Sequence, residues 1–291
     1  MTNFTEKLRN TENTHQLIIK QDNLLIKDYF CNNMETINPE EKKVNNLCRL
    51  LLDMGTLLMS SGANTSRIRT TIMRIASAYN YHAELLVTHR ALMLTVYGKD
   101  KDLFFNRLKR TPPQEANFKI VSGISRMSWK IVEEKWSLEK VEKELGILKN
   151  ISSYPRWLVL LAVSLAGASF CGLAGGKLIE CTVAYIATFC GLFVRQETAK
   201  KGYNGYLCVF TGAFISSILA GLTVKYNIGY YPQRALVSSV LYLIPGIPLI
   251  NTFSDLVEGN IMNGIVRGIN GLIISFAIAM GMMCAILIYH I

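Results

Sequence analysis

Charged residues are distributed very unevenly along this chain of 291 residues, and that unevenness limits the folds open to it. Residues 1–155 hold 23 of the 31 lysines and arginines and 17 of the 21 aspartates and glutamates, whereas residues 156–291 hold only 8 and 4. A long segment with so few charges is typical of a membrane domain. We therefore expect a water-soluble first part followed by a membrane-embedded second part.

The second part contains five apolar runs, each near or above the roughly 20 residues that a helix needs to cross the hydrocarbon core of a bilayer. They lie at about 156–174, 178–194, 206–224, 235–253 and 262–289. The second run is short, but Glu180 is its only charged residue, so we count it as a span. Five spans place the two chain termini on opposite sides of the membrane, and four would place them on the same side.

The basic residues favour a cytoplasmic N-terminus. Residues 1–46 are polar and carry seven acidic side chains, which is unlike a secretory signal peptide. Basic residues gather just before the first apolar run, at Lys140, Lys143, Lys149 and Arg156, and three more lie in the expected loop at 195–201. Cytoplasmic loops carry an excess of such residues, so both segments are expected on the cytoplasmic face.

The first part is predicted to be a small α+β domain over residues 39–153, preceded by a mobile polar leader over residues 1–38. Apolar residues recur at helical spacing in several segments, and other segments read as short strands. The expected helices cover about 40–61, 64–79, 117–134 and 137–148, and the expected strands lie within 83–97 (two strands) and 102–109. Residues 154–291 then form an all-helical membrane domain.

The fourth apolar run contains the sequence Ile244-Pro245-Gly246-Ile247-Pro248, which should break a membrane helix. A proline has no N–H, so the carbonyls four residues earlier, on Leu241 and Ile244, lose their helical partners. Such carbonyls are tolerated in a membrane only where they face protein or a polar cavity. Interrupted membrane helices of this kind often line substrate sites in transporters, so Pro245, Gly246 and Pro248 are candidate site residues.

Three polar residues follow the break, at Asn251, Asp255 and Glu258. Their spacing of four and three residues places them on one face if the helix continues. Charges at membrane depth are costly and mark functional sites, which makes all three candidates for substrate binding or gating. Alternatively, Asp255 and Glu258 lie at the cytoplasmic interface and are only solvated there.

Arg267 lies about two turns into the last apolar run and needs a partner, because an unpaired arginine at that depth is expensive. Asp255 or Glu258 can reach it if Gly259 and Asn260 form a tight turn between the two helices. An ion pair that locks this helical hairpin and a role in substrate binding both remain open. Glycines at 264, 268 and 271 form a stripe on the same helix that predicts close helix packing.

The sequence contains no pattern that supports catalysis, a metal or a cofactor. The seven cysteines include no C-x-x-C pair, and the four histidines are scattered. No phosphate-binding loop of the form G-x-x-x-x-G-K-[ST] occurs, so ATP-driven transport is unsupported. Nucleic-acid binding is not expected despite the net charge of +10, because the basic residues of the first part alternate with acidic ones.

Two weaker patterns occur in the first part. Ser137 and Lys140 match the S-x-x-K pattern of some hydrolases, but Ser137 stands where a helix N-cap is expected. Five polar residues of the first part are candidates for a polar pocket: Ser61, Arg67, Arg69, Thr88 and His89. Their positions in loops or on exposed helix faces explain their polarity better than a shared pocket does.

Two segments resemble the threonine/serine exporter (ThrE) family, in particular its split YjjP-type subunits. The first is Leu51–Ile68, an apolar helix followed by Ser-Gly-Ala and an arginine-bearing helix. The second is Leu243–Asn251, with its two prolines, followed by Asp255, Gly259 and Arg267. The proline signature is the more specific of the two, and the resemblance covers roughly residues 40–285.

The resemblance implies a cytoplasmic α+β domain followed by about five membrane helices in a bacterial inner membrane. It also implies secondary, ion-driven export of small metabolites, either threonine/serine-type amino acids or succinate-type dicarboxylates. Full-length members carry a second membrane unit, and in split members a separate small membrane protein supplies it. A partner subunit of that kind, in a homo- or hetero-oligomer, is therefore expected here.

These observations lead to one main hypothesis and one rival. In the first, the chain is an exporter subunit whose broken fourth helix supplies free carbonyls and Asn251, while Asp255 and Arg267 handle charge or gate access. In the second, it is a membrane-anchored regulatory or scaffold protein whose soluble domain binds a metabolite or a partner. A passive anchor needs neither a proline break nor polar residues at membrane depth, which favours the exporter.

Overall fold

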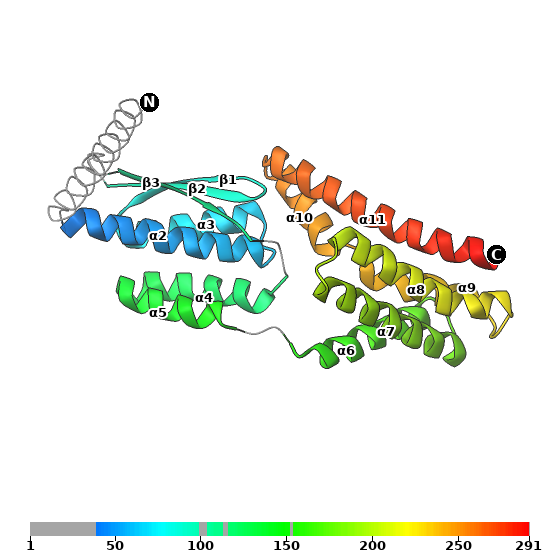
Figure 1. The fold of residues 1–291 in the computed structure, drawn as a ribbon. Coiled ribbons are helices and arrows are strands. Elements are labelled where there is room, and N and C mark those ends of the chain that lie inside the picture. Colours follow the sequence, from blue (N-terminus) through cyan, green and yellow to red (C-terminus); the bar gives the residue numbers. More distant parts are fainter. Residues whose placement is uncertain (1–38, 99–103, 113–115, 152–153, 291) are drawn as a thin grey trace, which may run out of the picture.

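The computed structural model describes residues 39–98, 104–112, 116–151 and 154–290. The expected leader at 1–38 lies outside the described residues. The chain forms a compact N-terminal part of helices and strands (residues 39–151) and a longer helical part (residues 154–290), which lie side by side in Figure 1.

The N-terminal part has three layers (Figure 1). A three-stranded antiparallel sheet in the order β1-β2-β3 covers one face of a helix pair, and a second helix pair covers the opposite face. The elements are α2 (Pro39–Ser60), α3 (Thr65–Ala78), β1 (His82–Val87), β2 (Ala91–Tyr97), β3 (Phe104–Arg110), α4 (Phe118–Glu134) and α5 (Leu138–Lys149). Each expected helix and strand of this part is present within a few residues of its expected bounds.

Apolar side chains at helical and strand spacing form the core between these layers. Leu51 and Leu58 of α2, Ile72 of α3 and Leu94 of β2 are fully buried. The helix starts are also determined locally, because Asn64, Asn117 and Ser137 cap α3, α4 and α5 through their side chains. The Ser137 side chain accepts a hydrogen bond from the Lys140 N–H, so the S-x-x-K pattern is a helix cap as expected.

The helical part contains four helices that are each long and apolar enough to span a membrane, and a bent pair that adds a fifth span if it is counted as one. The four are α6 (Arg156–Leu173), α7 (Leu178–Lys200), α8 (Gly205–Lys225) and α11 (Ile261–Tyr289). The bent pair joins α9 (Pro232–Val240) and a 3-10 turn (Leu241–Leu243) to α10 (Gly246–Val257) at an angle of 61°. The fold class expected from the sequence is confirmed: helices with a small sheet, followed by four to five long apolar helices.

The second span is longer than the sequence predicted. We expected a run over 178–194 and a loop at 195–201, but α7 continues to Lys200 and the turn begins at Lys201. The end of this helix is held by an ion pair of 2.6 Å between Glu197 and Arg156 at the start of α6. The polar residues after Val194 thus extend the helix beyond its apolar segment. A hydropathy pattern predicts only the apolar segment, so it placed the end of this helix too early.

The glycine stripe of α11 allows this helix to approach α10 closely, as expected. A Cβ atom at Gly264 would lie 2.8 Å from the Leu256 Cγ, and one at Gly271 would lie 2.9 Å from a methyl carbon of Leu249. Any larger residue at these positions would force the two helices apart. The close packing brings polar side chains of both helices together next to the N-terminal part.

Candidate functional site

The helix break has a defined backbone geometry. Pro245 has φ −79° and ψ 62°, and the Gly246 N–H donates to the Ile244 carbonyl at 2.8 Å, which is an inverse γ-turn. The Leu241 carbonyl accepts from the Ile244 N–H at 3.2 Å. The break is therefore where the sequence placed it, but the expectation of free carbonyls on Leu241 and Ile244 is wrong, because each accepts a local backbone hydrogen bond.

Pro248 does not break α10. It occupies the first turn of this helix, which begins at Gly246, and a first-turn N–H has no helical acceptor in any case. The N-terminal end of the helix dipole contributes a partial positive charge at this helix start.

Asp255 and Arg267 form a buried ion pair between α10 and α11. The Asp255 side chain is 0% exposed and that of Arg267 is 5% exposed, and Oδ2 lies 3.1 Å from Nη1. The tight turn that this pairing requires is present: Gly259 has φ +81°, and the Asn260 N–H donates to the Asp255 carbonyl at 2.7 Å. Glu258 is the exposed C-cap residue of α10, so it does not share this buried environment.

The same polar residues also hold the N-terminal part. Asp255 Oδ1 accepts a hydrogen bond of 3.0 Å from the N–H of Thr65, the first residue of α3. Arg267 Nη2 donates to the Ala63 carbonyl at 3.3 Å, and Asn251 Nδ2 donates to the Gly62 carbonyl at 2.9 Å. We call these three side chains together with residues 62–65 the interface clamp.

The interface clamp satisfies groups that the fold would otherwise leave unpaired. A helix N-terminus has free N–H groups and a partial positive charge, and a carboxylate stabilises both. Asp255 thus caps α3 from another part of the chain while it neutralises Arg267. The two segments that carry the family resemblance meet here in space, although about 190 residues separate them in the sequence.

A second row of contacts extends this interface along α11. The side chains of Asn263 and Asn270 contact the Val87 carbonyl at 2.9 Å and His89 Nε2 at 3.5 Å, and Arg69 donates to Asn260 Oδ1 at 3.2 Å. Burial, together with nearby Arg90 and Arg267, holds the pKa of His89 below its ordinary value. The imidazole is therefore neutral at pH 7.

Two cavities flank the break and share Pro248 and Ile274 in their linings. The larger has a volume of about 410 Å³ and lies between α11 and the β1–β2 hairpin; the smaller has about 300 Å³. Polar side chains that line the larger cavity are those of His89, Arg90, Tyr206, Arg267 and Asn270. The smaller is lined by Gly62, Pro245, Tyr242 and Arg195 among others. Neither lining includes an acidic residue. Arg195 makes the smaller cavity electropositive, and Arg90 does the same for the larger, in which Asp255 already neutralises Arg267.

The polar residues singled out in the N-terminal part do not form one pocket. Arg69 and His89 contact the helical part, as described above. Ser61 is buried, and the Thr88 hydroxyl closes its own turn against the Ala91 carbonyl at 2.9 Å. Arg67 lies at a separate cavity between α3 and α4. Spacing alone places Asn263 on the same face of the last helix as Arg267, but nothing in the sequence pairs it with Val87 or brings Arg90 and Tyr206 to one cavity, because these residues meet only in the fold.

A family profile described as "Putative threonine/serine exporter" (ThrE) matches residues 49–289. The chain belongs to the ThrE family. It is therefore a multi-pass membrane protein of a bacterial transporter family, and nothing suggests catalysis. No solved structure matches this ThrE chain with significance.

Curated relatives of this ThrE chain include two proteins named "Probable succinate transporter subunit YjjP". The one from Klebsiella aerogenes is 25% identical over 87% of this chain and 96% of its own length, and the one from Escherichia coli is 26% identical over 83% and 94%. The chain is also similar to a "Threonine/serine exporter" from Corynebacterium glutamicum, with 23% identity over 76% of this chain but only 46% of that protein.

Proposed function

We propose that this chain is a subunit of a secondary transporter that exports small dicarboxylates of the succinate type across a bacterial inner membrane. In this proposal residues 39–153 form a cytoplasmic domain, residues 154–291 form the membrane domain, and a separate small membrane subunit completes the exporter. The name of the YjjP relatives, which identifies them as transporter subunits, supports the need for a partner.

The observation that carries the proposal is the electropositive cavity of about 410 Å³ at the helix break. Arg90 and Arg267 supply two guanidinium groups there, and Tyr206 and Asn270 supply neutral polar groups. Arginine binds carboxylates through paired, charge-assisted hydrogen bonds. Two arginines from different parts of the chain therefore suit a ligand with two carboxylates.

The alternative substrates of the family, threonine and serine, fit this cavity less well. Their ammonium group needs an acceptor, and a carboxylate is the strongest one. The nearest carboxylate on the helical hairpin is that of Asp255, which is fully buried and already engaged by Arg267 and the Thr65 N–H. A zwitterion would thus compete with both partners of Asp255, whereas a dicarboxylate needs no acceptor: it would compete with Asp255 for Arg267 alone and would meet no carboxylate beside Arg90 in the cavity lining.

The interface clamp is the proposed gate. It closes α10 and α11 against residues 62–65, next to the cavity that Arg267 also lines. Opening this side would separate Asp255 from Thr65 and Asn251 from Gly62, while the pair of Asp255 with Arg267 could persist within the hairpin. Pro245, Gly246 and Pro248 supply the bend on which such a movement depends. Glu258, exposed at the end of α10, would be placed to meet solvent during opening.

The test is efflux of labelled succinate, threonine and serine from cells that express this chain with and without the candidate partner. We expect partner-dependent succinate efflux, and a loss of most of it in Arg90→Gln at unchanged membrane levels. Arg126→Gln, which changes an exposed arginine of α4 outside both cavities, is the matched control. Full succinate efflux in Arg90→Gln would refute the assigned site. Efflux of threonine alone would refute the assigned substrate class, and no efflux at all would favour a regulatory protein.

A further inference from the structure

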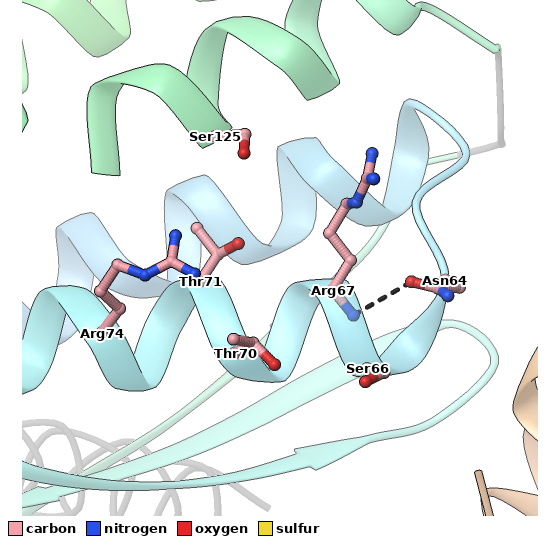
Figure 2. A pocket seen from close by; sticks show the side chains of 7 residues that line it. All are labelled: Asn64, Ser66, Arg67, Thr70, Thr71, Arg74 and Ser125. Carbon is pink, nitrogen blue, oxygen red and sulfur yellow. Dashed lines mark hydrogen bonds between the residues drawn. The ribbon is translucent and has the colours of Figure 1, made fainter. Parts of the chain in front are cut away.

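A third polar cavity lies within the N-terminal part, away from the helix break (Figure 2). It has a volume of about 340 Å³ and opens between α3 and α4. The lining residues used below are Asn64, Arg67, Thr71, Arg74 and Ser125, and none of the seven that line it is acidic. The proposed transport function leaves this cavity without a role.

Two arginines of α3 flank the cavity. Arg67 and Arg74 are seven residues apart, so they lie on one face of the helix two turns from each other. Figure 2 shows both side chains on the side of α3 that faces Ser125. Arg74 is held in place, because Nη1 donates to the Ser128 hydroxyl at 2.9 Å and the guanidinium lies 3.9 Å from the centre of the Trp129 ring. The Arg67 guanidinium has no hydrogen-bond or ionic partner among the described residues.

Thr71 supplies an independent indication of a ligand. Its side chain lines the cavity and is only 3% exposed, yet its hydroxyl makes no hydrogen bond within the described part of the chain. A buried hydroxyl in a helix usually bonds a carbonyl three or four residues earlier. Thr56 of α2 and Ser128 of α4, which are both buried, do so, to the carbonyls of Leu52 at 2.8 Å and Ser125 at 2.7 Å. Thr71 therefore lacks the partner that these two residues have.

We propose that this cavity binds a small oxyanion, a carboxylate or phosphate group, between the guanidinium groups of Arg67 and Arg74, with the Thr71 hydroxyl as a third donor. Each of the three groups donates hydrogen bonds, and the two positive charges have no acidic neighbour in the lining. A ligand of this charge would satisfy the free donors of Arg67 and Thr71 at the same time.

The position of the cavity gives the oxyanion a regulatory role. Asn64 lines it and caps α3, and the next residue, Thr65, donates its N–H to Asp255 in the interface clamp. An anion held by Arg67 would fix the first turn of α3, which is the turn that the interface clamp grips. This regulatory role rests on the proposed transport function, whereas anion binding itself does not.

The test uses the purified full-length chain in detergent and follows tryptophan fluorescence, because Trp129 contacts Arg74 directly. Inorganic phosphate and succinate are titrated separately, with chloride at equal ionic strength as the reference. We expect saturable binding of at least one probe. Its Kd should rise about tenfold or more in Arg67→Gln, which removes the guanidinium donors, and in Thr71→Val, which removes the hydroxyl donor. Thr71→Val keeps the side-chain shape, and Ser122→Ala is its control on the exposed face of α4.

One further variant separates this site from the proposed transport site. In Arg90→Gln, which alters only the cavity at the helix break, the binding that depends on Arg67 and Thr71 should remain for whichever probe shows it. Binding that is lost in Arg90→Gln and is insensitive to Arg67→Gln would overturn the inference, as would the absence of saturable binding of both probes or equal affinity in all variants. Phosphate binding without succinate binding would identify a phosphorylated ligand, and the reverse would identify a carboxylate.

Discussion

Replacing Asp255 with asparagine should loosen the interface clamp, because it leaves the Arg267 guanidinium buried without its counter-ion. Asn keeps an oxygen that can accept from the Thr65 N–H, so the helix cap is not lost outright. The change therefore removes the ion pair of 3.1 Å and little else. Removing one partner of a buried pair costs about 3–5 kcal/mol, and the retained cap places this change near the lower end.

A cost of about 3 kcal/mol corresponds to a roughly 100-fold increase in the population of the open interface. Hydrogen exchange measured by mass spectrometry on the full-length chain reports this opening. Amides at the start of α3, from Thr65 to Ile68, should exchange faster by that order, while those of the buried core of α2 should not change. Glu258→Gln is the matched control, because it removes a charge from the exposed end of the same helix.

The double variant Asp255→Asn with Arg267→Gln distinguishes an ion pair from simple loss of packing. A buried charge without a partner is the main cost in each single variant, so removing both charges should restore part of the protection. Protection at 65–68 that is unchanged in Asp255→Asn would refute the role of the pair in holding the interface. A double variant that opens as far as the sum of the single variants would refute the proposed coupling.

Two further predictions concern stability. Gly264→Ala should lower the unfolding temperature, at a cost of about 1–3 kcal/mol, because its Cβ would lie 2.8 Å from the Leu256 Cγ. Gly146→Ala in α5 is the control: a Cβ there meets nothing within 4 Å, so this change should be neutral or stabilising. Equal effects of the two changes on the unfolding temperature would contradict the packing argument. Burial acts to raise the pKa of Asp53, but hydrogen bonds and charges from lysines of β3 and α5 outweigh it and hold that pKa below its ordinary value. The stability it contributes is present above pH 4 and is lost as pH falls below about 4, so Asp53→Asn should reduce the acid sensitivity of unfolding, and an unchanged pH profile would contradict this reading.

The local elements of this chain could be predicted from its sequence, because local features determine them. Asn64 and Ser137 cap the helices that follow them, and the prolines at 245 and 248 mark a break that no apolar helix would contain. The end of α7 was misjudged for the opposite reason. Its last residues are polar and are held by an ion pair with α6. A hydropathy pattern records only apolar character, so it cannot indicate that the helix continues through these residues.

The candidate site was predictable only in part. The pairing of Arg267 with Asp255 followed from the cost of an unpaired charge and from a glycine that allows a tight turn. The contact of Asn251 with the Gly62 carbonyl could not be predicted in this way. It joins segments about 190 residues apart, and neither segment's sequence pattern indicates that the other lies beside it. The fate of the carbonyls at Leu241 and Ile244 also depended on a backbone turn that the presence of proline alone does not specify.

The position of the cavity at the helix break has an electrical consequence. Its lining includes His89, Arg90 and Thr111 of the N-terminal part, which the proposed function places in the cytoplasm. Under that function, a dianion released outward from this cavity crosses most of the membrane potential. With the cell interior negative, moving two charges gains up to about 4.6 kcal/mol for each 100 mV, so the resting potential alone assists the export of a dicarboxylate.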